Sequence, residues 1–175
     1  SNVAVGRNAL AANTTGTQNT SLGFQAGNSI TTGSNLTCIG YDADATSATA
    51  TNEITLGNAS VATLRCQVTT ITALSDERDK KDIKDIGLGL DFVQKLKPVK
   101  FKWAMRDGTE KPDIFEAGFI AQDFQHVQEE MNAKWMGLVY ESNPDKLEAT
   151  PGKLIPILVK AIQELMERVK LLESQ

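Results

Sequence analysis

Histidine and cysteine, two residue types often used in nucleophilic and metal chemistry, are scarce in this chain. His126 is the single histidine, so a Ser-His-Asp or Cys-His apparatus would depend on that one side chain. Cys38 and Cys66 lie in unrelated local contexts and predict neither a disulfide framework nor a four-ligand metal site. We therefore expect free, buried thiols, no metal and no cofactor, and a surface or capping role for His126 in a helix.

The densest group of ionisable side chains is a run of alternating charge from Ser75 to Ile86. Such a run ordinarily forms a solvated face or a turn. Ser75 is followed by acidic residues, a pattern that suits the N-cap of a helix. In that interpretation Lys80 is a solvated side chain. A serine and a lysine five residues apart carry little information alone, so a chemical role here needs support from the rest of the sequence.

Charge divides the chain into two halves near Ser75. The charged residues of the first half are Arg7, Arg65, Asp42, Asp44 and Glu53. Residues 75–175 carry all the others, and we expect residues 1–74 and 75–175 to be separate domains. The net charge of −4 gives no global attraction to nucleic acid or to an anionic membrane. No apolar run approaches the roughly 20 residues that span a bilayer, so we expect no membrane insertion.

The first half has an internal period of 17 residues. The glycines that define the period each follow an aliphatic residue, and they are Gly6, Gly23, Gly40 and Gly57. Each unit is predicted to be a short strand, a glycine turn, a short strand and a turn. Repeats of this size must stack on neighbours in the chain or on other chains. Because Phe24 and Tyr41 are the only aromatic residues here, we expect an all-β trimeric stalk with a shared core; a monomeric β-solenoid is the alternative.

The second half is predicted to be α+β. Apolar residues at helical spacing predict a helix over residues 86–96, which Pro98 ends. Val99, Phe101 and Trp103 alternate with lysines, which indicates a strand with one buried face. A turn around residues 107–108, an apolar segment over 115–121 and a helix over 122–131 follow. Trp103 and Trp135 are expected to be anchors in the core or in a subunit contact.

A long helix is predicted over about residues 153–175, after Pro151 and Gly152. Its apolar residues form a heptad seam with β-branched residues at a and leucine at d, namely Ile155, Leu158, Ile162, Leu165, Val169 and Leu172. Arg168 at g can pair with Glu173 at e of a neighbouring helix. With the stalk repeats, this seam favours a parallel homotrimeric coiled coil. A two-stranded coil and a helix packed on its own domain are the alternatives.

Several motifs resemble the C-terminal intramolecular chaperones of phage endosialidase tailspikes, tail fibres and neck appendages. The first is Ser-Asp-x-Arg-x-Lys-x-x-Ile, which runs from Ser75 to Ile83 and includes Asp76 and Arg78. Pro-Val-x-Phe-x-Trp at 98–103, Gly-Phe-Ile-Ala-Gln at 118–122 and the C-terminal helix follow in the family's order. The resemblance covers residues 75–175, and the period-17 repeats resemble phage fibre stalks and the heads of trimeric adhesins.

The resemblance implies a chaperone that folds a trimeric fibre and then releases itself. Mapped onto this sequence, the scissile bond is Leu74–Ser75, Ser75 is the nucleophile and Lys80 is the general base. A lysine acts as a base only when neutral, so burial or nearby positive charge must lower its ordinary pKa of about 10.4. Asp79 departs from the family, which commonly has an apolar residue there. A carboxylate that met Lys80 would favour the ammonium form.

These observations predict a single-turnover autoproteolytic serine peptidase with a Ser-Lys dyad, carried by a fibre or neck appendage of a virion. Its partners would be two further copies of the chain, the rest of the fibre, and a host-surface receptor bound by the mature fibre. The chaperone domain would act in the host cytoplasm during assembly. The alternative function is a permanent, uncleaved trimeric receptor-binding tip of a viral fibre or adhesin.

Overall fold

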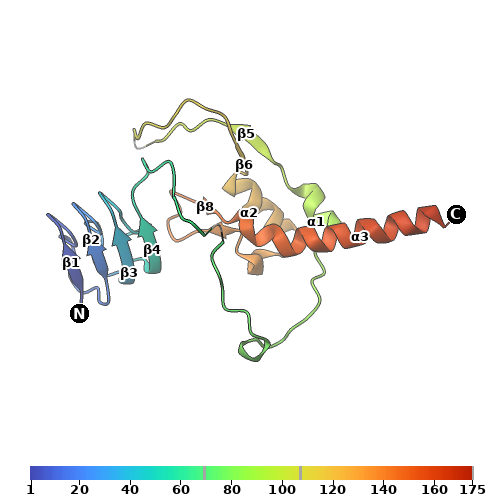
Figure 1. The fold of residues 1–175 in the computed structure, drawn as a ribbon, viewed down its shortest axis with the longest axis horizontal. Helices are drawn as coiled ribbons and strands as arrows, with labels where there is room; N and C mark the ends of the chain where they lie inside the picture. The colour runs from blue at the N-terminus through green and yellow to red at the C-terminus, as the bar shows by residue number, and fades with distance from the viewer. Residues whose placement is uncertain (69, 107, 175) are drawn as a thin grey trace. The chain divides into compact units, whose positions relative to one another are not determined.

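The computed structural model describes residues 1–68, 70–106 and 108–174. The fold is mixed α/β and ends in a long helix (Figure 1). The chain divides into two compact units. The first comprises Ser1–Leu64, Lys102–Phe115 and Glu141–Leu147, and the second comprises Arg65–Phe101, Glu116–Tyr140 and Glu148–Gln175. Asp107 in the expected turn and Gln175 at the end of the expected C-terminal helix lie outside the described residues.

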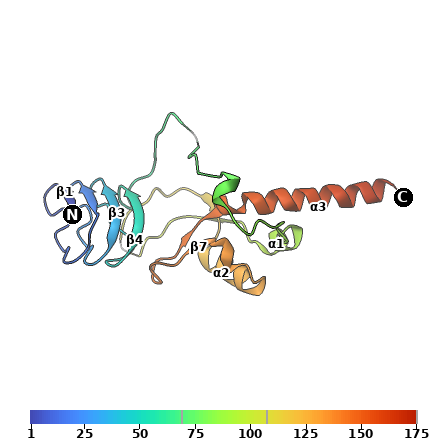
Figure 2. The same cartoon turned by 90° about the horizontal axis from the view of Figure 1, so that it is seen from below.

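A four-stranded parallel sheet carries the repeats of the first unit. Its strands are β1 (Val3–Val5), β2 (Thr20–Leu22), β3 (Ser34–Ile39) and β4 (Thr51–Leu56). They pair in chain order, so equivalent residues of successive repeats lie side by side, and one row consists of Val5, Leu22, Ile39 and Leu56. Figure 2 shows the turns of chain stacked along this direction. The predicted 17-residue period is therefore the register of the sheet.

Each repeat contains one strand rather than the two that we predicted. The return path consists of turns, because Asn8, Gln25 and Asp42 at equivalent positions adopt left-handed backbone conformations that end the extended chain. Hydrogen bonds between repeats hold these turns, for example from Thr31 N to Ala48 O at 2.9 Å. The polar, turn-forming residues of the return path thus pair along the stack without forming a second sheet.

The periodic glycines are required by the close approach of successive turns. Gly23 has a φ of +142°, and a Cβ at this position would lie 2.3 Å from the carbonyl oxygen of Gly40. A side chain would therefore overlap the backbone of the next repeat. The glycine spacing follows directly from stacking.

The repeats have a small core within a single chain, although we expected little material for one. Its buried residues are Leu10, Ala26, Ile30, Leu36, Cys38, Ala43 and Ala50. Burial, reinforced by Asp44 and Glu53, raises the pKa of the Cys38 thiol to about 11. Cys66 is exposed, so the expectation of buried thiols is right for Cys38 and wrong for Cys66. The stack therefore has buried residues of its own, and a further core shared between chains stays a prediction.

The described residues of the second unit form three α-helices, three short 3₁₀ helices and two small antiparallel sheets. The helices are α1 (Leu90–Lys95), α2 (Ala121–Glu130), α3 (Ile155–Glu173), η1 (Glu77–Asp79), η2 (Lys134–Met136) and η3 (Pro151–Leu154). β5 (Val99–Phe101) pairs with β6 (Glu116–Gly118), and β7 (Val139–Tyr140) pairs with β8 (Glu148–Ala149).

Most of the elements expected here are present, several of them with shorter bounds. The helix expected over 86–96 begins only at Leu90, because Gly87 and Gly89 disfavour an earlier start. The side chain of His126 is exposed on α2, as predicted. Trp103 and Trp135 are not core residues, since 48% and 67% of their surfaces are exposed. Their expected role as subunit contacts stays a prediction.

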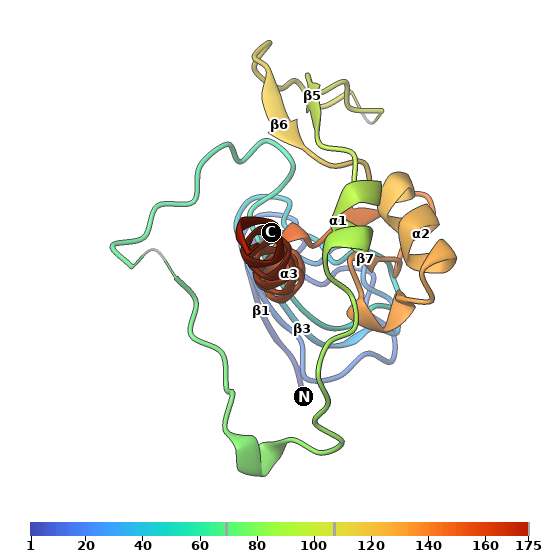
Figure 3. The same ribbon diagram turned by 90° about the vertical axis from the view of Figure 1, so that its right-hand side faces the viewer.

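α3 packs on its own unit through one narrow stripe. Ile157 and Ala161 are buried, as is Leu154 of η3 just before the helix, and α3 lies against α1, as its end-on view shows (Figure 3). The carboxylate of Glu164 continues the stripe and accepts a hydrogen bond from Leu90 N at 2.8 Å. Glu164 therefore caps the start of α1, where Gly89 itself has no side chain to do so.

Replacing Glu164 with alanine is expected to lower the free energy of unfolding by about 1–2 kcal/mol, because the partly buried Leu90 N–H loses its acceptor. Glu164→Gln keeps an acceptor oxygen and should lose less than half of that amount. Urea unfolding at one fixed protein concentration measures both changes, since assembly would make stability depend on concentration. Equal stability of the alanine variant and the unaltered chain would contradict this role.

Candidate functional site

The motif that begins at Ser75 forms a tight turn around η1. Asp76 is the N-cap, and its carboxylate accepts a hydrogen bond from Arg78 N. Lys80 is the C-cap, with its backbone N–H donating to Glu77 O at 3.0 Å. The turn folds the lysine side chain back, so Lys80 Nζ lies 2.6 Å from Ser75 Oγ and 3.1 Å from Ser75 O. The two predicted catalytic side chains are thus in direct contact.

Asp76, rather than Ser75, caps this helix. Its carboxylate also accepts two hydrogen bonds from the Arg78 guanidinium, from Nε at 3.0 Å and from NH2 at 2.7 Å. The serine hydroxyl therefore contacts the lysine and is not used as the cap we considered. From the sequence we expected Arg78 to be one source of the positive charge near Lys80, and we did not predict its pairing with Asp76. The Asp-x-Arg spacing could have indicated it, because aspartate side chains commonly accept from the backbone two residues on.

The same contacts lower the pKa of the Asp76 carboxyl below its ordinary value, first through the guanidinium of Arg78 and then through its backbone N–H. Because the pKa in the folded chain is depressed, the contribution of these contacts is present above the ordinary pKa. It is lost as the pH falls through the lowered pKa. The turn around η1 should consequently keep its geometry at neutral pH and loosen only in acid.

Arg78→Ala should raise the pKa of Asp76 back towards the ordinary value of about 3.9. Lys81→Ala removes the same charge from a neighbouring exposed residue and should leave the Asp76 titration nearly unchanged. Side-chain carboxyl NMR of the three chains against pH measures this. The same Asp76 pKa in all three would show that the Asp76–Arg78 pair does not form in solution.

The turn and the bond before it are accessible in the single chain. Leu74 is 98% exposed, and Ser75, Lys80 and Ile83 are also exposed. Among the described residues, Asp79 forms no ion pair with Lys80. The predicted nucleophile and the predicted base are therefore in contact, but both are exposed.

The seam predicted on α3 lies on the side of the helix that is not packed. Its residues, which we call the α3 seam, are Ile155, Leu158, Ile162, Leu165, Val169 and Leu172, and all of them are exposed. Arg168 and Glu173 are exposed as well. The buried stripe and the α3 seam are thus two different faces of one helix, so packing within the chain leaves the α3 seam available.

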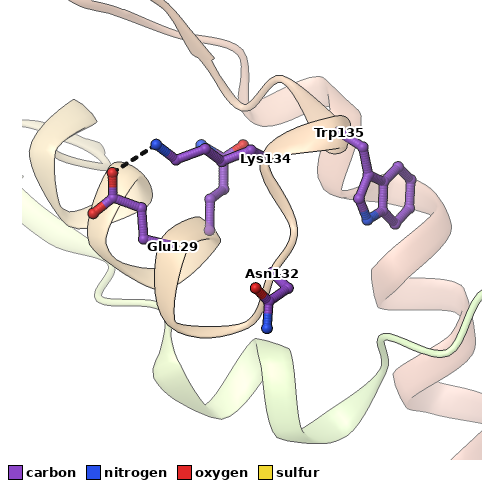
Figure 4. Close-up of a pocket in the computed structure, with 5 residues that line it drawn as sticks. Glu129, Asn132, Lys134 and Trp135 are labelled. Carbon is purple, nitrogen blue, oxygen red and sulfur yellow. Dashed lines mark ion pairs between the residues drawn. The ribbon is translucent and has the colours of Figure 1, made fainter.

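A shallow pocket of about 280 Å³ lies beside the end of α2 and η2, lined by Gln128, Glu129, Asn132, Lys134 and Trp135 (Figure 4). Glu129 and Lys134 form an ion pair at 2.8 Å across its edge. The pocket holds no arrangement of nucleophile and base.

In the described part of the chain, no group of three His, Cys, Asp or Glu side chains is placed to hold a metal ion. None of the described helices is both long enough and apolar enough to cross a membrane.

Comparison with known proteins identifies the segment that contains this turn. No curated protein and no solved structure matches the chain. A protein-family model described as "Chaperone of endosialidase", which its name classes as a peptidase family, matches residues 75–132. The match begins at Ser75, the predicted nucleophile, and includes Lys80, α1 and α2. The resemblance recognised in the sequence is therefore confirmed for residues 75–132, the segment that matches the model of this family.

Proposed function

We propose that this chain is part of a phage fibre or appendage whose C-terminal domain trimerises, promotes folding of the repeats and then cuts the Leu74–Ser75 bond. The observation that carries the proposal is the 2.6 Å contact between Lys80 Nζ and Ser75 Oγ in a segment that matches the chaperone family. The family match supports the chaperone role. The contact supports the finer statement that the segment is a serine peptidase acting on its own chain.

Two exposed apolar surfaces support assembly into a homotrimer. The first is the α3 seam, whose heptad spacing suits a parallel coiled coil. The second is the row of Val5, Leu22, Ile39 and Leu56 on the outward side of the sheet, each about half exposed. Surfaces of this kind on a single chain usually mark contacts with other chains. Arg168 and Glu173 flank the α3 seam, where they can pair between neighbouring helices.

The proposed reaction begins with transfer of the Ser75 hydroxyl proton to the neutral amine of Lys80. Ser75 Oγ then attacks the carbonyl carbon of Leu74, and the resulting tetrahedral intermediate carries the negative charge on the Leu74 oxygen. The C–N bond between Leu74 and Ser75 breaks, and the Ser75 nitrogen takes the proton back from Lys80. The product is an ester between Leu74 and Ser75 Oγ, which water hydrolyses to a Leu74 carboxylate and a free Ser75 hydroxyl and amine.

Assembly would supply what the exposed turn lacks. Ser75 and Lys80 are in contact but open to water, where an ammonium group is well solvated. We propose that the other two chains cover the turn and bring further positive charge towards it, which favours the neutral lysine needed for the first step. Cleavage would then report that the trimer has formed.

Intact-mass measurement of the freshly assembled protein tests this function. We expect two species in equal amount, one ending at Leu74 and one beginning at Ser75. Persistence of the uncut mass in a fully trimeric sample would overturn the peptidase activity, and it would indicate a permanent receptor-binding tip instead. A strictly monomeric sample would overturn the assembly function.

A further inference from the structure

The last repeat is polar at the positions that form the core of the preceding repeat. Ile30, Leu36 and Cys38 are almost completely buried in the third turn of chain. Seventeen residues later these positions are Ser47, Glu53 and Thr55, and the sheet register pairs Leu36 with Glu53 and Cys38 with Thr55. Repeat proteins require such a polar terminal unit to end an apolar stack. In this chain the polar end also has specific hydrogen-bonding partners.

Glu53 closes the turn of the last repeat through Thr46. Its carboxylate accepts hydrogen bonds from Thr46 N at 3.0 Å and from Thr46 Oγ1 at 2.7 Å. The two residues are seven positions apart, so these bonds exist only when the chain between them has completed its turn. The conformation of Thr46 therefore depends on closure of the repeat.

A loop from the C-terminal half contacts the same threonine. Residues Glu141–Leu147 belong to the first compact unit together with the repeats, although they connect β7 to β8. Asn143 Nδ2 donates to Thr46 O at 2.9 Å, and Ser142 Oγ lies 3.0 Å from Thr46 Oγ1. Since the single proton of the Thr46 hydroxyl goes to the Glu53 carboxylate, Ser142 must be the donor to Thr46. All three polar atoms of Thr46 are thereby engaged.

The loop is organised for this contact by bonds of its own. Asn143 Oδ1 accepts from Asp145 N at 3.0 Å, which forms a local turn and orients the side-chain amide. Arg106, from the 102–115 segment of the same unit, donates to Asp145 O. The amide of Asn143 therefore uses its oxygen to shape the loop and its nitrogen to bind the repeat.

We infer that Thr46 and Glu53 at the end of the repeats form a docking site for the loop 141–147. The site joins segments on opposite sides of the Leu74–Ser75 bond, and its biological meaning rests on the proposed function. The docking site exists only when the last repeat has closed its turn. The loop 141–147 therefore binds the folded form of this repeat and not the unfolded one. The contact does not run through the Leu74–Ser75 bond, so cutting that bond does not by itself break it.

Hydrogen exchange measured by mass spectrometry on the full chain tests the docking site, with Ser75→Ala present throughout so that all molecules stay uncut. Asn143→Asp keeps the oxygen that shapes the loop and removes the donor to Thr46. Loss of one hydrogen bond predicts about five-fold faster exchange in a peptide covering residues 44–53. Thr46→Val should likewise speed exchange in a peptide covering residues 139–147, since coupling is reciprocal.

Asn58→Asp is the matched control. It adds the same charge, and its side-chain oxygen accepts from Ser60 N in a similar local turn, so exchange in both peptides should stay unchanged. Ser142→Ala is a second variant in case Asn143→Asp disturbs the whole chain. It removes a single donor to Thr46 and should also make exchange faster in the peptide covering residues 44–53. Failure of either peptide to respond would overturn the docking site. The exchange measurement requires neither cleavage nor trimers, so a failure of the proposed function would be seen separately, in the intact mass.

Discussion

Ser75→Ala is expected to yield a trimer that stays uncut, with the cleavage rate reduced by roughly a thousandfold or more, because the reaction loses its nucleophile. The side chain is exposed and small, so the substitution removes little packing. Lys80→Met should reduce the rate to a similar extent, since the proton of the hydroxyl then has no acceptor 2.6 Å away. Denaturing gels of samples taken during assembly measure the cut fraction.

Lys81→Met is the control for the lysine substitution. Lys81 is the neighbouring residue, is exposed and carries the same charge, but it is not in contact with Ser75 in the structure. We expect it to cut at nearly the rate of the unaltered chain. Equal loss of cleavage with Lys81→Met and Lys80→Met would mean that general positive charge matters and that Lys80 is not the base.

Ile162→Asp is expected to prevent assembly. Ile162 occupies the centre of the α3 seam, and three carboxylates would be brought together there without partners, at a cost of several kcal/mol. The residue is 57% exposed in the single chain, so the fold of the protomer should survive. Sedimentation equilibrium should give a monomer at micromolar concentration, and if assembly gates the peptidase, the Leu74–Ser75 bond should remain intact.

Gln163→Asp adds the same residue one position along the same helix, outside the α3 seam. It carries the same change in charge and helix propensity and should leave the trimer intact. Circular dichroism should show that both variants are folded, so that a difference in assembly is not caused by unfolding of the protomer. A stable trimer of Ile162→Asp would show that the α3 seam does not nucleate assembly.

Elements with a strong periodic signature were predictable from the sequence. The glycine period gave the register of β1 to β4, because equivalent residues of a stacked repeat must lie beside each other. α3 was predicted close to its bounds from its heptad spacing, and α2 lies within one residue of the range predicted for it at each end. We predicted two strands in each repeat, and the structure has one. Residues in the left-handed backbone conformation, such as Gln25, prevent a second strand, but their residue types do not reveal this conformation.

The candidate site around Ser75 was predictable only in part, and not from a periodic pattern. Ser75 and Lys80 came from a family resemblance, and the structure places them in contact. We did not predict that α3 has a buried stripe as well as the exposed α3 seam. Ile157 and Ala161, which form the buried stripe, lie between seam residues in the sequence and add no separate period. The contacts of Thr46 with Ser142 and Asn143 join residues nearly a hundred positions apart, and polar contacts of that range leave no sequence pattern.

The most direct test of assembly-gated cleavage is a refolding time course of the unaltered chain from denaturant. Native gels follow the trimer and denaturing gels of the same samples follow the cut at Leu74–Ser75. The account predicts uncut trimer first and cut trimer afterwards, with the rate of cutting independent of protein concentration once the trimer has formed. Cut monomer that appears before any trimer would contradict it.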